Sequence, residues 1–314
     1  MPGPPLAPGS LAVKLQLHDE LPVEHRLAEL LDQARIADAV GFDGIVLGEH
    51  HAGVLPGYVP NPVSVIGWLL ARTSAVWGAP CPTLLLPRPT GLAVEELAWL
   101  AAAFPGRVAA GFAAGWAEVD FAVTGASRDR LAERFERELV RAASVLTGRA
   151  QAPLSGDAAV QRLAERPLPV VSAASSGLAC RRAARAGVGV LLDSQIDAAV
   201  AGRRVAGYAG AGGTGPRAIV RRIWLGDPPA GLYDRQLALY RGQAERLGIE
   251  PGIDAAIVSG EAAEVAGRLA DLLRATRASS LILQIHLPGL EAGAARQQLE
   301  RVGTDLLPRL RTVA

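Results

Sequence analysis

Short apolar segments typical of buried β-strands alternate with helical patterns along the whole chain, and this alternation constrains the fold more than any other feature. Strands that alternate with helices favour a parallel sheet. Eight such strands in 314 residues are the count of a closed (β/α)₈ barrel, so we predict an α/β fold of this kind, with an open doubly wound sheet as the alternative. The predicted strands are Leu11–Leu17, Gly44–Gly48, Trp77–Leu86, Arg107–Phe112, Pro169–Ala173, Val188–Leu192, Arg217–Trp224 and Ser280–Ile285.

Apolar residues at helical spacing, ended by glycine or proline, predict a helix after each strand. Two segments depart from the simple alternation: a loop insertion around residues 148–168 and an extra helix near Tyr233–Leu247, after the seventh strand. Residues 1–10, rich in glycine and proline, are predicted to be a disordered leader, and residues 11–314 a single domain. The other predicted helices are Glu24–Val40, Pro62–Arg72, Leu92–Phe104, one that begins near Ser127, Ser176–Ala186, Ile196–Tyr208, Glu261–Ala275 and Glu291–Leu310.

The charge and cysteine content exclude several classes of protein. A formal net charge of +1 argues against a general electrostatic grip on nucleic acid or on an anionic membrane. The two cysteines, Cys81 and Cys180, form neither a CxxC pair nor a Cys/His cluster with zinc spacing, so we predict no disulfide scaffold and no metal centre. No signal peptide or membrane-spanning run is visible, and a cytoplasmic protein is the expectation.

The stretch from Gly41 to Pro62 carries the strongest functional signal. A short apolar strand ends there at Glu49-His50-His51, and a long Gly/Pro loop leads to the predicted helix cap Asn61-Pro62. Titratable residues at the carboxyl end of a buried parallel strand lie where α/β barrels and doubly wound sheets place their active sites. Neither a G-x-G-x-x-G fingerprint after the first strand nor a Walker A motif is present, which disfavours a nucleotide-fold dehydrogenase.

Strand alternation predicts which other polar residues join this site. Gln16 and His18 share one face of the first strand, and Gln284 and His286 share the same face of the eighth. A barrel makes these strands neighbours, so the four side chains should face inward near the mouth and form a hydrogen-bonding pocket with His50. The alternative for each histidine is a position in a surface loop.

With these segments in place, the chain resembles the bacterial luciferase-like flavin monooxygenase family over nearly its whole length. Four stretches in this order and spacing carry the resemblance. The resemblance implies a (β/α)₈ barrel that binds reduced flavin mononucleotide (FMN) at its carboxyl end. The stretches are GFDGIVLGEHH at 41–51, LLLPRPTGLAVEELAWLAAAFPGRVAAGFAAGW at 84–116, PLPVVSAASSGLACRRAARAGVGVLL at 167–192 and VSGEAAEVAGRLADLL at 258–273.

The resemblance implies roles at the end of the second strand. His50 matches the family's active-site histidine, which would move a proton beside the flavin, whereas a loop histidine with a structural hydrogen bond is the alternative. Glu49 would orient the loop, and His51 would be structural.

The resemblance also implies a flavin site. Ser175-Ser176-Gly177 would hold the flavin phosphate at a helix N-terminus, a role compatible with Ser176 as an ordinary N-cap. Pro82-Thr83 would lie beneath the flavin ring, with a cis Cys81–Pro82 bond as one form of that segment and Cys81 as a packing residue. Trp116 would line the pocket or anchor its loop.

Two departures from the family pattern bear on this site. Luciferase carries a phosphate-binding arginine after its fourth strand, and this chain has Ala114 at the matching place, which weakens the phosphate site. The family's Leu-Asp-x-x-Ser-x-Gly-Arg before that strand has become residues 101–107, AAAFPGR, which we interpret as structural drift.

The function that the resemblance implies is a two-component monooxygenase. Reduced FMN would come from a separate flavin reductase, and a flavin hydroperoxide formed with O₂ would oxidise a small organic substrate. A relative that uses a deazaflavin coenzyme for hydride transfer and a non-catalytic flavin-binding partner subunit are the alternatives. A homodimer through the second and third helices is expected, with four leucines as either interface or core: Leu69, Leu70, Leu97 and Leu100.

Overall fold

A computed structural model describes residues 3–150, 152–247 and 257–313. The strands form one parallel sheet in the order β3-β2-β1-β10-β8-β7-β6-β5-β4, and β9 pairs with β8 off this path. The strands are β1 (Leu11–Lys14), β2 (Gly44–Leu47), β3 (Trp77–Pro80), β4 (Thr83–Leu84), β5 (Ala110–Ala113), β6 (Val170–Ala173), β7 (Gly189–Leu192), β8 (Arg217–Leu225), β9 (Ile257–Gly260) and β10 (Ser280–Gln284).

The sheet curls until its two ends meet, which confirms the predicted barrel. A bridge joins Gly78 of β3 to Val108, and the Gly78 N–H donates to the Arg107 carbonyl at 2.8 Å. The predicted third strand therefore belongs to both ends of the sheet: its first half, β3, pairs with β2, and its second half, β4, pairs with β5. The two halves flank a cis Cys81–Pro82 peptide bond.

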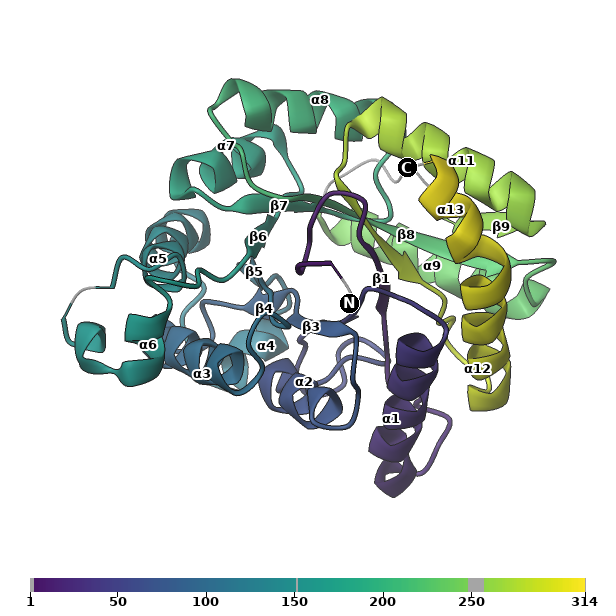
Figure 1. The fold of residues 1–314 in the computed structure, drawn as a ribbon, viewed down its shortest axis with the longest axis horizontal. Helices are drawn as coiled ribbons and strands as arrows, with labels where there is room; N and C mark the ends of the chain where they lie inside the picture. The colour runs from purple at the N-terminus through teal and green to yellow at the C-terminus, as the bar shows by residue number, and fades with distance from the viewer. Residues whose placement is uncertain (1–2, 151, 248–256, 314) are drawn as a thin grey trace.

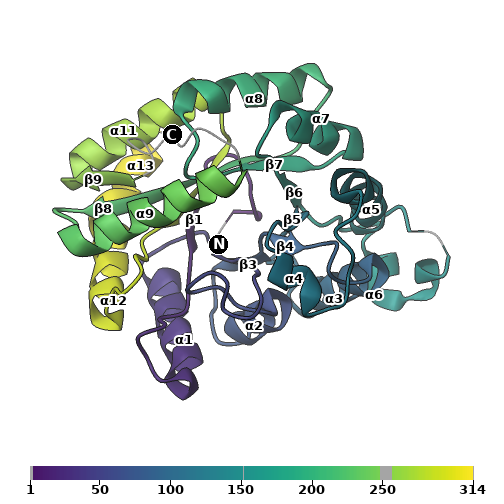
Figure 2. The same cartoon turned by 180° about the vertical axis from the view of Figure 1, so that it is seen from behind.

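Helices surround the strands on the outside (Figure 1), and the view from behind shows the same ring (Figure 2). The predicted insertion contains the short helices η1 and α6, and the predicted extra helix after the seventh strand is α9. The helices are α1 (Val23–Ala39), α2 (Pro62–Leu70), α3 (Thr90–Ala103), α4 (Glu118–Ala122), α5 (Leu131–Leu146), η1 (Leu154–Gly156), α6 (Ala158–Arg162), α7 (Gly177–Ala186), α8 (Ala198–Gly210), α9 (Ala230–Leu247), α11 (Ala262–Thr276), α12 (Ala292–Arg301), η2 (Val302–Leu306) and α13 (Leu307–Val313).

Apolar side chains pack on both sides of the sheet. Leu15, Leu283 and Ile285 lie in the large cluster between the strands and the helices, as strand alternation predicted. A smaller cluster fills the barrel interior and includes Ala12, Val220, Ile282 and Leu6. The amino-terminal part of the barrel is thus a packed core, as in other barrels of this type.

The prediction of a disordered leader is wrong for residues 3–10. Leu6 has 1% of its side-chain surface exposed and packs into the interior cluster. The Gly9 N–H donates to the Ser279 carbonyl at 2.7 Å, which fastens the leader beside β10. The leader thus lies over the middle of the ring of strands (Figure 1), because its leucine can bury more apolar surface there than in water.

From the glycines between the predicted strand Arg107–Phe112 and the helix predicted to begin near Ser127, we expect a loop over Ala113–Ala126, but this segment contains the helix α4. Gly115 and Gly125, which flank α4, both have positive φ angles, 83° and 70°, so the glycines that indicated a loop serve as turns around a short helix.

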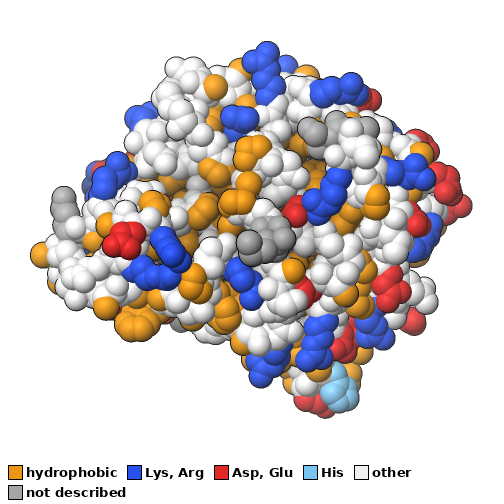
Figure 3. Space-filling model, in the orientation of Figure 1, with side chains coloured by type: hydrophobic (Ala, Val, Ile, Leu, Met, Phe, Trp, Pro, Cys, Tyr) orange, Lys and Arg blue, Asp and Glu red, His pale blue; other side chains and the backbone are white. Residues whose placement is uncertain are grey.

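The surface agrees with the composition. Arginine and acidic side chains are interspersed over the face shown in Figure 3, and no broad field of one sign covers it. Within residues 3–150, 152–247 and 257–313, we find no helix with the length and apolar character needed to cross a bilayer.

Candidate active site

A cavity of about 460 Å³ lies at the carboxyl ends of the strands. This volume is in the range of small-molecule sites. Its walls contain seven of the residues that the sequence predicted, whereas five others, His18, Glu49, Thr83, Ser176 and Gly177, lie outside its lining. The seven are Gln16, His50, Pro82, Trp116, Ser175, Gln284 and His286.

His50 is held at the cavity wall by a buried carboxylate. Its Nδ1 donates to Asp120 Oδ2 at 2.8 Å, and Asp120 is fully buried in α4. The other oxygen of Asp120 accepts the His51 backbone N–H at 2.8 Å, which fixes the carboxylate. Burial lowers the pKa of His50, and Asp120 opposes that shift without cancelling it. His50 is therefore a neutral imidazole at pH 7 whose Nε2 is free to accept a proton.

Aromatic rings enclose the same imidazole. The ring of Tyr58 lies 4.8 Å from that of His50, and the ring of Trp116 lies 5.8 Å away, both edge to face. These contacts restrict the orientation of His50 and limit the access of water to it.

Glu49 points away from the cavity. Its Oε1 accepts hydrogen bonds from Arg88 Nη2 and His51 Nε2, both at 3.0 Å, and its Oε2 accepts the Leu84 N–H at 3.1 Å. Burial raises the pKa of Glu49, while Arg88 acts in the opposite direction. These contacts tie the end of β2 to β4, in keeping with an orienting role, and they leave His51 a structural partner.

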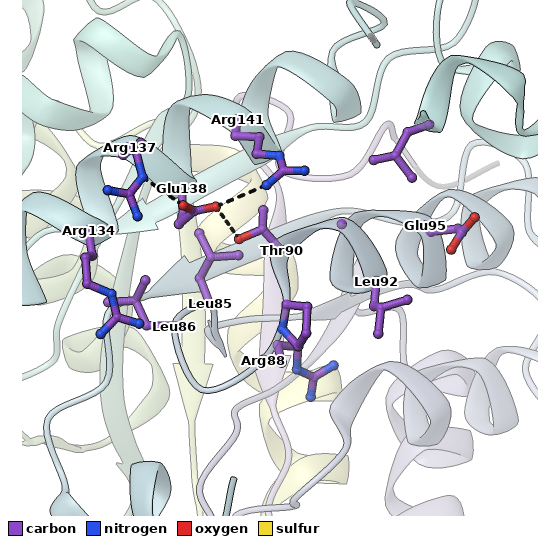
Figure 4. A pocket seen from close by; sticks show the side chains of 13 residues that line it. Leu85, Leu86, Arg88, Thr90, Leu92, Glu95, Arg134, Arg137, Glu138 and Arg141 are labelled. Carbon is purple, nitrogen blue, oxygen red and sulfur yellow. Dashed lines mark hydrogen bonds and ion pairs between the residues drawn. The ribbon is translucent and has the colours of Figure 1, made fainter. Parts of the chain in front are cut away.

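Arg88 also reaches a groove on the outer surface between α3 and α5, of about 430 Å³ (Figure 4). There its Nη1 donates to Glu96 at 3.0 Å. Glu138 accepts hydrogen bonds from Thr90 at 2.8 Å and from Arg137 at 3.0 Å, so several charges of this groove neutralise one another.

The N-terminus of α7 opens onto the cavity. The Ser176 hydroxyl accepts the Ala179 N–H at 3.2 Å and is therefore an N-cap, while the exposed Ser175 lines the cavity. Arg182, one turn further along α7, lines the cavity as well and pairs with Glu136 at 3.3 Å. A cationic side chain thus stands beside the predicted phosphate site, although Ala114 replaces the arginine of luciferase.

The interior of the barrel carries a polar layer of which the sequence predicted only Gln284. Lys14 of β1 lies opposite Gln284 of β10, and Gln284 lies opposite Arg222 of β8. All three line the cavity, one level above the apolar layer of Ala12, Ile282 and Val220. The alternation that predicted Gln16 also places Lys14, two residues earlier, on the same face, and this signal would have found it.

The next level contains Gln16 and His286, both of which line the cavity as predicted. Gln284 donates a hydrogen bond to Gln16 across the two strands. Burial, together with the neighbouring His18, holds the pKa of His286 well below its usual range, so this ring is neutral.

His18 packs behind His286. The rings are 4.9 Å apart, edge to face, and His18 Nδ1 donates to the Leu290 carbonyl at 2.8 Å. With the exposed Glu20, the two histidines have ligand atoms within 4.8 Å of one another, a grouping that could hold a metal ion. The expectation of no metal centre stays a prediction.

Comparison with known proteins bears on the family and the fold of this chain. The family model for luciferase-like monooxygenases matches residues 11–223, more than half of the chain. An F420-dependent glucose-6-phosphate dehydrogenase from Microbacterium testaceum (strain StLB037) is 30% identical over 183 residues, 54% of this chain. The match spans about half the length of that relative, 53%.

Solved structures share the fold over almost the whole chain. The monooxygenase RslO1 from Streptomyces bottropensis has a TM-score of 0.79 at 19% identity, over 95% of this chain and 99% of that one. The oxygenating constituent of 3,6-diketocamphane monooxygenase from Pseudomonas putida, in complex with FMN, has a TM-score of 0.77 at 16% identity, over 96% and 98%. An F420-dependent secondary alcohol dehydrogenase has a TM-score of 0.71 at 14% identity, over 96% and 98%. The extent of the family match, the closed barrel and the histidine at the end of β2 together mean that this chain belongs to the luciferase-like monooxygenase family.

Proposed function

We propose that this protein is the oxygenating component of a two-component flavin monooxygenase that uses reduced FMN and O₂ to oxidise a small organic substrate. The observation that carries the proposal is that one cavity is lined both by the N-terminal end of α7 and by the Asp120-held His50. An anion site and a proton-transfer group thus belong to the same enclosed space.

The residues present fit a flavin. Ser175, the free N–H groups at the start of α7 and the Arg182 guanidinium would hold the phosphate. Ala114, which also lines the cavity, leaves room there that an arginine would fill. Pro82 and Trp116 would flank the ring. When bound, reduced FMN would supply the electrons for the reaction with O₂.

The chain's own residues would move the proton and exclude water. His50 Nε2 would accept a proton and return it, since Nδ1 is committed to Asp120. Asp120 would hold the tautomer and stabilise the protonated ring when it forms. Tyr58, which stacks edge-on against His50, and Trp116 would keep bulk water from the reacting atoms.

Hydride transfer with a deazaflavin coenzyme is the second candidate. The observation that favours it is the 30% identity to a dehydrogenase that depends on F420. The phosphate end and the neutral His50 would serve either coenzyme. A non-catalytic partner subunit is the weaker alternative, because a scaffold has no need of the His50–Asp120 pair.

An anaerobic titration distinguishes the two coenzymes. Purified protein is titrated separately with reduced FMN and with reduced deazaflavin coenzyme, and oxygen is then admitted. Tight binding of FMN alone, followed by reoxidation slower than that of free reduced FMN, is the expected result. Binding of the deazaflavin alone would assign the protein to hydride transfer.

The His50→Ala variant separates catalysis from scaffolding. We expect turnover to fall by about 10²-fold or more, the range for loss of a general acid–base group, while the affinity for FMN stays within a few-fold. His25→Ala, at an exposed position on α1, is the matched control and should keep full turnover. Unchanged turnover in His50→Ala would refute the catalytic role.

The partners and the location belong to the same proposal. A separate flavin reductase would supply reduced FMN, and the protein would act in the cytoplasm. A homodimer through α2 and α3 would not use Leu69, Leu70, Leu97 and Leu100, because these leucines are buried in the core of the single chain. Leu92 and Trp99 of α3, each 56% exposed, would form its apolar contact.

A further inference from the structure

Two cations in the barrel interior lie in one row across three neighbouring strands. Lys14, Gln284 and Arg222 are in register on β1, β10 and β8, and all three line the cavity. Neighbouring strands are about 4.8 Å apart, so the two cationic residues start about 10 Å apart, with an amide between them. Long side chains from such positions can converge on one small group.

Arg222 has unused hydrogen-bonding capacity. Its side chain is 4% exposed, its Nε donates to the Tyr240 hydroxyl at 3.0 Å, and its Nη1 has no partner. A buried guanidinium N–H without an acceptor is costly, and an arginine in such a place usually has a carboxylate or phosphate partner. Arg222 lines the cavity, so its guanidinium keeps hydrogen-bond donor capacity at the cavity wall.

Lys14 is in a similar state. Its Nζ donates to the Tyr58 hydroxyl at 2.9 Å and lies 4.5 Å from the centre of that ring. Burial lowers the pKa of Lys14, but Tyr58 and Asp193 raise it, and the net direction is upward, so the side chain is charged at pH 7. Of its three ammonium donors, Tyr58 takes one.

The chain itself provides little negative charge to balance the row. Among the residues that the structure describes, neither Lys14 nor Arg222 forms an ion pair. Asp193 also lines the cavity and its negative charge acts on Lys14, and its Oδ1 accepts the Ser194 N–H at 2.5 Å and the Ser194 hydroxyl at 3.1 Å. Gln16 and Gln284 have neutral amide side chains, which are hydrogen-bonded to each other.

We propose that the substrate carries an anionic oxygen group, most simply a carboxylate, which Arg222 and Lys14 bind from either side of Gln284. The inference rests on the proposed function only in calling the ligand a substrate. Arg222 would supply guanidinium N–H donors, and Lys14 its remaining ammonium donors. The apolar remainder of the molecule would lie toward His50 and Trp116, where the oxidation is proposed to occur.

Matched acid and amide pairs test this. Binding of phenylacetate and phenylacetamide, and of octanoate and octanamide, is measured by calorimetry with the purified chain, both alone and saturated with oxidised FMN. We expect at least one acid to bind about tenfold or more tightly than its amide, as charge-assisted hydrogen bonds in an enclosed site require. Equal affinity of acid and amide in both pairs would overturn the proposal.

Variants locate the effect. Arg222→Gln and Lys14→Met should each bring the acid-to-amide ratio to within about threefold of unity. Arg217→Gln, on the same strand but outside the cavity lining, removes the same charge and should leave the ratio unchanged. The wild-type comparison stands even where a variant fails to fold.

The measurements with FMN distinguish this substrate proposal from the assignment of FMN as the coenzyme. A ratio that persists in Arg222→Gln while the affinity for FMN drops tenfold would mean that the row serves the coenzyme, and it would refute a substrate role. Acid selectivity without any FMN binding would keep the anion site and refute the flavin function instead.

Discussion

Three consecutive residues at the end of β2 have three different surroundings. Glu49 is buried against Arg88 and β4, His50 lies at the cavity wall, and His51 turns back to Glu49. The family resemblance had implied different roles for these three residues. It did not predict Asp120, which lies 70 residues later in a segment that the glycines marked as a loop. A partner so distant in sequence leaves no local signal of its own.

The carboxylate of Asp120 should set the pH dependence of activity. Burial lowers the pKa of His50 and Asp120 partly restores it, so Asp120→Asn should lower that pKa further. Because a general base must be neutral, the acid limb of the kcat/KM profile should move to lower pH, and the plateau should fall by about tenfold or more as the tautomer is lost. Measurement of kcat/KM from about pH 5 to about pH 9, a range that brackets the ordinary histidine pKa of about 6.5, checks both effects.

Glu118→Gln, an exposed position on the same short helix, is the control and should leave the acid limb in place. An acid limb that moved upward in Asp120→Asn would contradict the electrostatic role.

At the scale of elements, the number and order of barrel strands followed from the sequence because each buried strand is a short apolar run between glycines, prolines or helix ends. The sequence predicted the boundaries of the strands less accurately. The predicted third strand is two strands, β3 and β4, and β9 (Ile257–Gly260), which pairs with β8 off the main strand order, was not predicted. Pairing with a neighbour, which a single segment does not encode, decides such cases.

Asp38 near the end of α1 holds the entry to β3. Its carboxylate accepts the backbone N–H groups of Ser74, Ala75 and Val76, each at 2.8 Å. We expect Asp38→Ala to lower the free energy of unfolding by about 1–3 kcal/mol, since these donors lose a charged acceptor. Denaturant unfolding measures this, and Asp32→Ala on the exposed face of the same helix should change stability by less than about 0.5 kcal/mol.

The same carboxylate gives this contribution a pH dependence. Burial by itself raises the pKa of Asp38, but the backbone N–H groups lower it by more, and the net direction is downward. The stabilisation is therefore present above the unfolded pKa of about 3.9 and is lost as the pH falls through the lower folded value. The difference between wild type and Asp38→Ala should shrink only in that acid range.

At the scale of the whole molecule, the leader belongs to the core. Leu6→Ala should lower the free energy of unfolding by about 2–4 kcal/mol, because it leaves a cavity in the barrel interior. Leu27→Ala, at a leucine that is 45% exposed, is the matched control and should cost less than about 1 kcal/mol. Equal losses in the two variants, measured by denaturant unfolding, would mean that the leader does not pack as described.

Because apolar side chains fill the amino-terminal end of the barrel, the cavity opens at the carboxyl ends of the strands. Coenzyme and substrate would then enter the cavity by the same opening. The molecule bound beside Lys14 and Arg222 would lie deepest in the cavity. A ligand at that level would be shielded from bulk water by a molecule bound nearer the opening. The packing of Leu6 in the interior cluster would thus bear on the end of the barrel by which ligands enter and leave.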